Sequence, residues 1–99
     1  MSYGFRAAFV LLRTYMQKHH LYTIEKIIHR WAPPTENNTI AYIEFVCHAT
    51  GIGGRELLTP TDKRLPELVW AMAIMEAGSQ IKAYRRHLEA GWRMYLDES

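Results

Sequence analysis

Hydrophobic positions in this chain recur at intervals of three and four residues, which is the spacing of one face of an α-helix. The first such stripe predicts a helix from about Tyr3 to His19. Its apolar positions are Phe5, Phe9, Leu12 and Met16, widened by Ala8, Leu11 and Tyr15. Polar residues fill most of the other positions, so one side of this helix is expected to face a core.

A second, shorter helix is predicted after Thr23, whose hydroxyl is a suitable N-cap. Its apolar face consists of Ile24, Ile27, Ile28 and Trp31. Pro33 and Pro34 then end the helix, because proline removes a backbone donor and restricts the residue before it.

A third helix is predicted from about residues 37–39, where asparagine or threonine can cap it, to about Thr50, with Gly51 as a left-handed C-cap. Its inner stripe is expected to be Ile40, Ile43, Val46 and Cys47, extended by Tyr42, Phe45 and Ala49. The longest loop follows, over residues 51–61. Its Gly51-Ile52-Gly53-Gly54 start lacks the Gly-Lys-Ser/Thr of a phosphate loop and is expected to be a flexible turn.

A fourth helix is predicted after Asp62 as its cap, with Pro66 tolerated in the first turn and Gly78 ending or bending it. Its core side should hold Leu65, Leu68, Val69, Met72 and Met75. A fifth helix, or a kinked continuation, should carry Ile81, Tyr84, Leu88, Trp92 and Tyr95. No segment alternates with the period of a strand, so the prediction is an all-α fold of four to five helices in one compact domain over residues 1–99.

Composition agrees with a globular protein, since 48% of the 99 residues are hydrophobic and 22% are charged. The net charge of +2 is too even to indicate a nucleic-acid partner, and the nearest basic cluster is Lys82, Arg85, Arg86 and Arg93. No apolar run reaches the ~18 residues of a membrane span. The N-terminal segment follows helical spacing without a clear cleavage site, so neither a membrane partner nor a signal peptide is expected.

Metal and cofactor chemistry is not expected from these residues. Cys47 is the only cysteine, which excludes an intrachain disulfide and favours a small core residue. The five histidines form no ligand pair four residues apart and no His-Glu-x-x-His motif.

The densest group of chemically distinctive residues runs from Trp31 to Tyr42. An aromatic ring beside a carboxylate and amides suits a hydroxyl-rich ligand such as a sugar. The predicted ligand-binding residues are Trp31, Glu36, Asn37, Thr39 and Tyr42. The alternative is an ordinary turn between helices, in which Trp31 completes a core stripe, Glu36 is solvated and an asparagine caps the next helix.

Glu76 is a second candidate, because it projects from the edge of an otherwise apolar helix face four residues after Met72. A carboxyl held against apolar surface has a raised pKa, as a glycosidase general acid requires. In the alternative, Glu76 lies in the exposed last turn of a helix that ends at Gly78.

Several segments together resemble a family of small phage and prophage virion-associated proteins. They are residues 4–8, 11–15, 23–24, 27–28, 30–34 (Arg-Trp-Ala-Pro-Pro), 36–39 (Glu-Asn-x-Thr) and 42–43, with a weaker match through Gly51 and residues 68–78. Family members are usually labelled virion structural proteins, and their pattern is similar to the lysozyme-like, cell-wall-active class. The resemblance implies a lysozyme-like helical core, peptidoglycan or other virion proteins as partners, and a location in the virion or the bacterial cytoplasm.

The chain departs from the family pattern in two places. Family members commonly begin with a block carrying Asn-Pro-Gly-Asn-Ile-Arg, which would make this chain a truncated core. They also tend to have His-Glu-Asn-Gly where this chain has Met75-Glu76-Ala77-Gly78. The resemblance covers about residues 1–81, so residues 82–99 are expected to form an extra C-terminal helix.

Three hypotheses follow. The first is a phage- or prophage-derived, non-catalytic structural or peptidoglycan-binding module. The alternative is an enzyme that cleaves the glycan strand, a lytic transglycosylase or lysozyme-like hydrolase with Glu76 as the acid and Glu36 as an alternative or second carboxylate. A third, compatible with either, is a homodimer formed through Trp92, Tyr95, Tyr84 and the methionine-rich face of the fourth helix.

Overall fold

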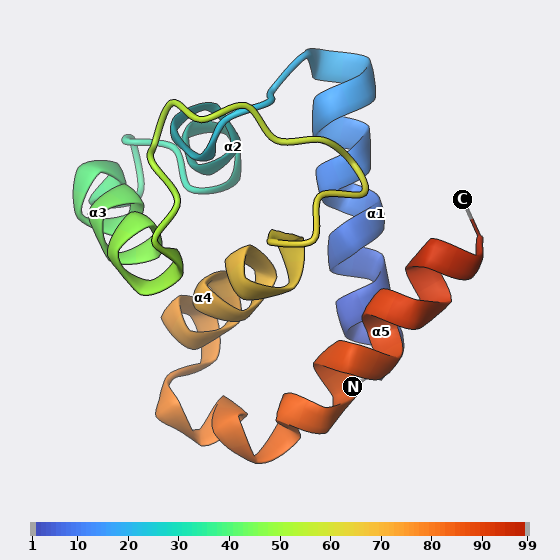
Figure 1. Cartoon of the computed structure of the whole chain (residues 1–99). Helices are drawn as coiled ribbons and strands as arrows, with labels where there is room; N and C mark the ends of the chain where they lie inside the picture. Colours follow the sequence, from blue (N-terminus) through green and yellow to red (C-terminus); the bar gives the residue numbers. More distant parts are fainter. Residues whose placement is uncertain (1, 99) are drawn as a thin grey trace.

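The computed structural model describes residues 2–98, and every regular element in that range is helical (Figure 1). The elements are α1 (Ser2–His19), α2 (Ile24–Trp31), α3 (Thr39–Thr50), α4 (Leu65–Ala77), the 3-10 helix η1 (Ser79–Tyr84) and α5 (Arg85–Asp97). The predicted all-α fold is confirmed. Helix α4 is separate from the elements that follow it, because Gly78 takes a positive φ of 81° and turns the chain away from the axis of α4.

Local capping explains where α2 and α3 begin and where α3 ends. The hydroxyl of Thr23 accepts a hydrogen bond from the Lys26 N–H at 3.3 Å, and Oδ1 of Asn38 accepts one from the Ala41 N–H at 3.1 Å. Gly51 ends α3 with φ 73°, a left-handed conformation that favours glycine. The predicted caps of these two helices are confirmed.

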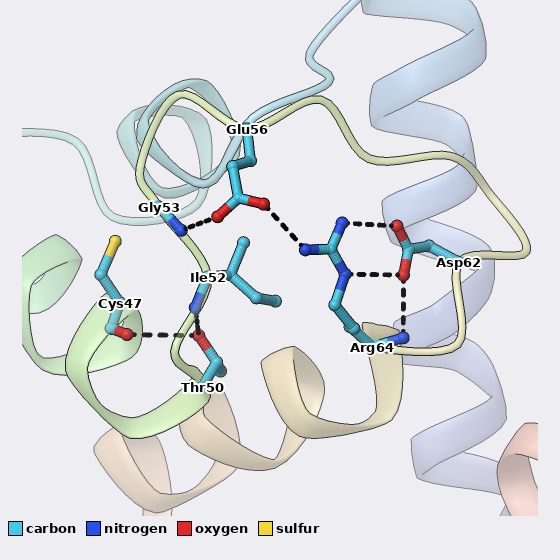
Figure 2. Close-up of polar contacts among 7 residues, drawn as sticks. All are labelled: Cys47, Thr50, Ile52, Gly53, Glu56, Asp62 and Arg64. Atoms are coloured by element: carbon cyan, nitrogen blue, oxygen red, sulfur yellow. Dashed lines mark hydrogen bonds and ion pairs between the residues drawn. The ribbon is translucent and has the colours of Figure 1, made fainter.

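The predicted cap of α4 is wrong. Arg64, not Asp62, precedes the helix, and its side chain makes no capping bond. The carboxylate of Asp62 instead accepts from the Arg64 N–H at 2.9 Å and from the Arg64 guanidinium at 3.0 and 3.1 Å (Figure 2). The guanidinium of Arg64, two residues away, binds this carboxylate in place of the N–H groups of the helix.

The loop between α3 and α4 is tied down at several points, contrary to the expected flexible turn. Arg64 also donates to Oε1 of Glu56 at 2.9 Å, and the Gly53 N–H donates to the other oxygen of that carboxylate (Figure 2). Ile52 and Leu58 are each 2% exposed. Their burial anchors the loop to the core, because removing an isoleucine or leucine side chain from water is worth about 1.5–3 kcal/mol.

Helix α1 packs most extensively against α5, at the opposite end of the chain (Figure 1). The predicted α1 stripe is buried, and its Phe9 ring centroid lies 4.8 Å from that of Trp92 and 5.6 Å from that of Tyr95. Arg6 adds an ion pair to Glu98 at 2.9 Å. Tyr95, one of the residues offered for a homodimer contact, is therefore buried in the core, and Trp92, another of them, is half-buried against it.

The buried face of α3 differs from the predicted one. Ile40 is 68% exposed, whereas Thr39, Tyr42 and Val46 face the core. Thr39 and Tyr42 are tolerated there because each hydroxyl has a partner, the carbonyl of Ala32 for Thr39 and groups on α4 for Tyr42. The predicted Val46 and Tyr42 are thus buried, and Ile43 and Cys47 are half-buried against the core. Ile40 is the member of the inner stripe that hydrophobicity alone placed wrongly.

Candidate functional site

A chain of hydrogen bonds joins α2, α3 and α4 through three of the candidate residues. The indole Nε1–H of Trp31, the last residue of α2, donates to the hydroxyl of Tyr42 at 3.1 Å. That hydroxyl donates to Oε2 of Glu76 at 3.1 Å, and the carbonyl of Met72 lies farther off at 3.5 Å. The Glu76 carboxylate is both the nearer and the stronger acceptor. The geometry therefore favours donation from Trp31 to Tyr42 and from Tyr42 to Glu76.

Tyr42, the middle residue of this series of hydrogen bonds, is buried, and its burial fixes the direction in which the phenol donates. Tyr42 is 4% exposed, and burial, followed by the adjacent Glu76 carboxylate, raises the pKa of its phenol well above the ordinary value, although the Trp31 hydrogen bond opposes this shift. Tyr42 therefore remains a proton donor to Glu76 at neutral pH.

Glu76 itself is exposed and lies in the last turn of α4, immediately before the Ala77–Gly78 end of the helix. This is the alternative placement considered from the sequence. The desolvation that would prepare a general acid is lacking at this side chain. Its Oε1 atom accepts no hydrogen bond from the residues that the structure describes, and it is open to an external donor.

Beside this carboxylate lies a cavity of about 430 Å³ between α1 and α4. Glu76 is the only charged residue among those that line it, and Trp31 is the other residue with a polar side-chain group. The remaining lining residues are Gly4, Phe5, Ala7, Ala8, Leu11, Leu12, Val69, Met72, Ala73, Ala77 and Ile81. This volume lies in the range of small-molecule sites, which are mostly apolar with a few placed polar groups.

Small side chains account for the cavity. Ala7 and Ala8 on α1 and Ala73 and Ala77 on α4 stand where larger residues would fill the space between two packed helices. The sequence analysis did not detect this feature. Its only signal was the occurrence of paired alanines in two helices, which is also typical of ordinary helix packing.

The other candidate residues lie on or near the turn between α2 and α3. Glu36 and Asn37 are exposed there, and Asn37 donates from Nδ2 to the Pro33 carbonyl at 3.2 Å. Thr39 is 3% exposed and donates its hydroxyl to the Ala32 carbonyl. None of these three lines the cavity. The structure thus brings Trp31, Tyr42 and Glu76 together and leaves Glu36 and Asn37 on the adjoining surface.

Within residues 2–98, no group of three or more His, Cys, Asp or Glu side chains is arranged to hold a metal ion. Cys47 is half-buried, and burial together with Glu25 and Glu56 raises the pKa of its thiol, which suits a packing role better than a nucleophilic one. In the same part of the chain, no helix combines the length and apolar character needed to cross a membrane.

The fold and the site define a small helical protein with an apolar cavity whose rim carries one oriented carboxylate. The sequence is 45% identical over 82 residues to Protein P5 of Pseudoalteromonas phage PM2. The match covers 83% of this chain and 50% of that protein, so the chain spans about half the length of its relative. Similarity of this extent makes the chain a homologue of a phage protein.

No family model matches the chain, and no solved structure matches it either. The phage resemblance seen in the sequence is thus confirmed through Protein P5. The relationship to lysozyme-like proteins stays a prediction.

Proposed function

We propose that this chain is a phage-derived virion protein that acts without catalysis, as a structural or peptidoglycan-binding module. The Trp31–Tyr42–Glu76 chain at the rim of the apolar cavity is the observation that carries the proposal. The similarity to a phage protein supports the virion association.

The chemistry of this rim matches a ligand with both polar and apolar groups. The indole of Trp31 is 37% exposed and can offer part of its face to a sugar ring. Glu76 offers Oε1 to a hydroxyl, amide or ammonium donor. The apolar wall beside it suits methyl groups, which peptidoglycan carries on its N-acetyl groups and alanines.

A glycan-cleaving enzyme is the second candidate, and the placement of Glu76 at a cavity rim favours it. A reaction that uses the sugar's own hydroxyl as the nucleophile needs only one acid. Two features make this candidate the weaker one. Glu76 is exposed rather than held against apolar surface, and Glu36, the expected second carboxylate, does not line the cavity.

Sedimentation with insoluble peptidoglycan, followed by mass spectrometry of the supernatant, tests the proposal. A binding module is expected in the pellet without released muropeptides. Glu76→Gln, which keeps the shape and removes the charge, should weaken binding by about tenfold, the worth of one charge-assisted hydrogen bond. Glu89→Gln on the exposed side of α5 is the matched control and should bind normally.

Other outcomes discriminate between the candidates. Released fragments that disappear with Glu76→Gln would establish the enzyme instead. If the protein neither binds peptidoglycan nor releases fragments from it, peptidoglycan is removed from the proposal and the structural role is left. Co-assembly with other virion proteins then tests that role.

A further inference from the structure

A second concave surface lies where the end of α1 meets α2, and its lining is dominated by basic groups. It encloses about 610 Å³ and is lined by His19, His20, Leu21, Glu25, Lys26, His29 and Arg30. We refer to it as the basic concavity. Five of its seven residues carry a cationic or imidazole side chain, whereas only one carries a carboxylate.

The backbone places His20 in the concavity in an unfavourable conformation. Its φ of 57° is left-handed, and it is the only non-glycine residue with positive φ in the described part of the chain. The N–H groups of His20 and Leu21 donate to the Met16 and Tyr15 carbonyls at 3.1 and 3.0 Å, which closes α1 with the motif that usually holds glycine. An imidazole at this position is strained where glycine would not be, and such strain is concentrated at functional sites.

Neighbouring contacts orient two of the other basic side chains, those of Arg30 and His29. The guanidinium of Arg30 lies over the Tyr15 ring, 5.9 Å from its centroid. Nδ1 of His29 lies 2.8 Å from the Glu25 carbonyl and donates to it, so Nε2 is the nitrogen left for an external partner once the ring is protonated. The single carboxylate, Glu25, has its own cation in Arg55 at 3.6 Å.

Helix dipoles explain part of this arrangement, because basic residues are favourable in the last turns of α1 and α2. They do not explain why both basic ends converge on one hollow. Nor do they explain a histidine at the residue after α1, in a left-handed conformation. The convergence is the feature expected of an anion site.

We propose that the basic concavity binds a phosphate-bearing anion. A phosphate group carries up to two charges and several acceptor oxygens, which match a guanidinium, an ammonium and imidazoles spread over one hollow. A single carboxylate would leave most of these donors unused. This site uses none of the residues that line the apolar cavity, so it stands or falls independently of the proposed function.

Two probes identify the source of the phosphate. Calorimetry with tripolyphosphate tests a soluble ligand, and co-sedimentation with phosphatidylglycerol vesicles, against phosphatidylcholine vesicles, tests a lipid headgroup. Binding of either probe that weakens steeply with added salt supports the site. Failure of both probes at low salt would overturn it, and a clear preference for a short DNA duplex over both would assign the surface to nucleic acid instead.

A charge-matched pair of variants separates a local site from overall charge. The double variant Lys26→Gln/Arg30→Gln is expected to lose about tenfold or more in affinity, the worth of one or two charge-assisted contacts. Lys82→Gln/Arg86→Gln removes the same charge from two exposed residues outside the concavity and should bind normally. Equal losses in both variants would show nonspecific attraction.

His20→Gly provides an independent readout. Because glycine relieves the left-handed strain, this variant should unfold at a higher temperature and yet bind the phosphate probe more weakly. A more stable variant with unchanged affinity would remove His20 from the site.

Discussion

The hydroxyl of Tyr42 lies 3.1 Å from Oε2 of Glu76, so a buried phenol on α3 holds the carboxylate of an exposed residue on α4. The two residues are 34 positions apart in the chain. Neither was paired with the other in the sequence analysis. Their contact unites the two candidate sites into one.

We expect Tyr42 and Glu76 to be energetically coupled. Tyr42→Phe should lower the free energy of unfolding by about 1–2 kcal/mol, since the Trp31 indole N–H and the Glu76 carboxylate each lose the hydroxyl as a partner. Glu76→Gln should cost less, because the residue is exposed. A double-mutant cycle in urea should give a coupling of about 0.5–1 kcal/mol, and strict additivity would show that the carboxylate charge adds nothing to a hydrogen bond that glutamine can also accept.

At alkaline pH the buried phenols should destabilise the protein. Burial raises the pKa values of Tyr15, Tyr42 and Tyr95, so the folded state keeps protons that the unfolded state releases. Stability should therefore be intact below about pH 10, the unfolded value, and fall as pH rises beyond it. Urea unfolding across this range measures the slope.

Tyr42→Phe removes one of these phenols and should make the alkaline slope shallower. Tyr84→Phe, at a residue that is 42% exposed, is the control that should leave the slope unchanged. Identical slopes for the wild type and the Tyr42 variant would contradict this account.

At acidic pH the protein should lose the stability that the Asp62–Arg64 pair contributes. The hydrogen bond from Arg64 lowers the pKa of Asp62, so its contribution is present above about pH 4 and is lost as pH falls through the lower folded value. Arg64→Gln should lower the free energy of unfolding only slightly at neutral pH, because the guanidinium is exposed, and it should flatten the acid limb of the stability profile.

Arg55→Gln is the matched control for this ion pair. Its side chain is 90% exposed and lies 3.6 Å from its partner carboxylate, so little change is expected at any pH. Equal effects of the two arginine variants would mean that net charge, rather than the loop contact, sets acid stability.

Two glycine variants should change stability in opposite directions. A Cβ added at Gly4 or at Gly51 would meet no atom within 4 Å. Steric clashes therefore do not account for the expected difference between the two variants. Gly4→Ala in the first turns of α1 should stabilise the fold by about 0.5 kcal/mol. Gly51→Ala, at φ 73°, should cost about 1–2 kcal/mol. Thermal unfolding of both variants checks the signs.

Apart from the Asp62 cap, the features that depend on neighbours in the sequence could be predicted, and those that depend on tertiary partners could not. The Thr23 cap, the Gly51 turn and the α1 stripe follow from local chemistry alone. The burial of Thr39 on α3 was missed, because a threonine is tolerated in the core only where a group such as the Ala32 carbonyl accepts from its hydroxyl.

The site shows the same division. Trp31 and Tyr42 are 11 positions apart and could be grouped from the sequence. The cavity could not be predicted, because it depends on alanines from two helices that meet only in the folded chain. Likewise, the sequence drew attention to Arg85, which the structure pairs with Glu67 and stacks 4.9 Å from the Trp70 ring. The basic groups that converge come from the end of α1 and from α2 instead.

The packing of α1 against α5 has a consequence for how the protein is made. Helix α1 leaves the ribosome before α5, and its Phe9 meets Trp92 and Tyr95 only after α5 has been translated. Until then its apolar stripe stays uncovered on the nascent polypeptide, where it can attract chaperones or other nascent chains. Native folding is therefore expected to finish after translation of α5, and ribosome stalling before Trp92 should yield a protease-sensitive nascent chain.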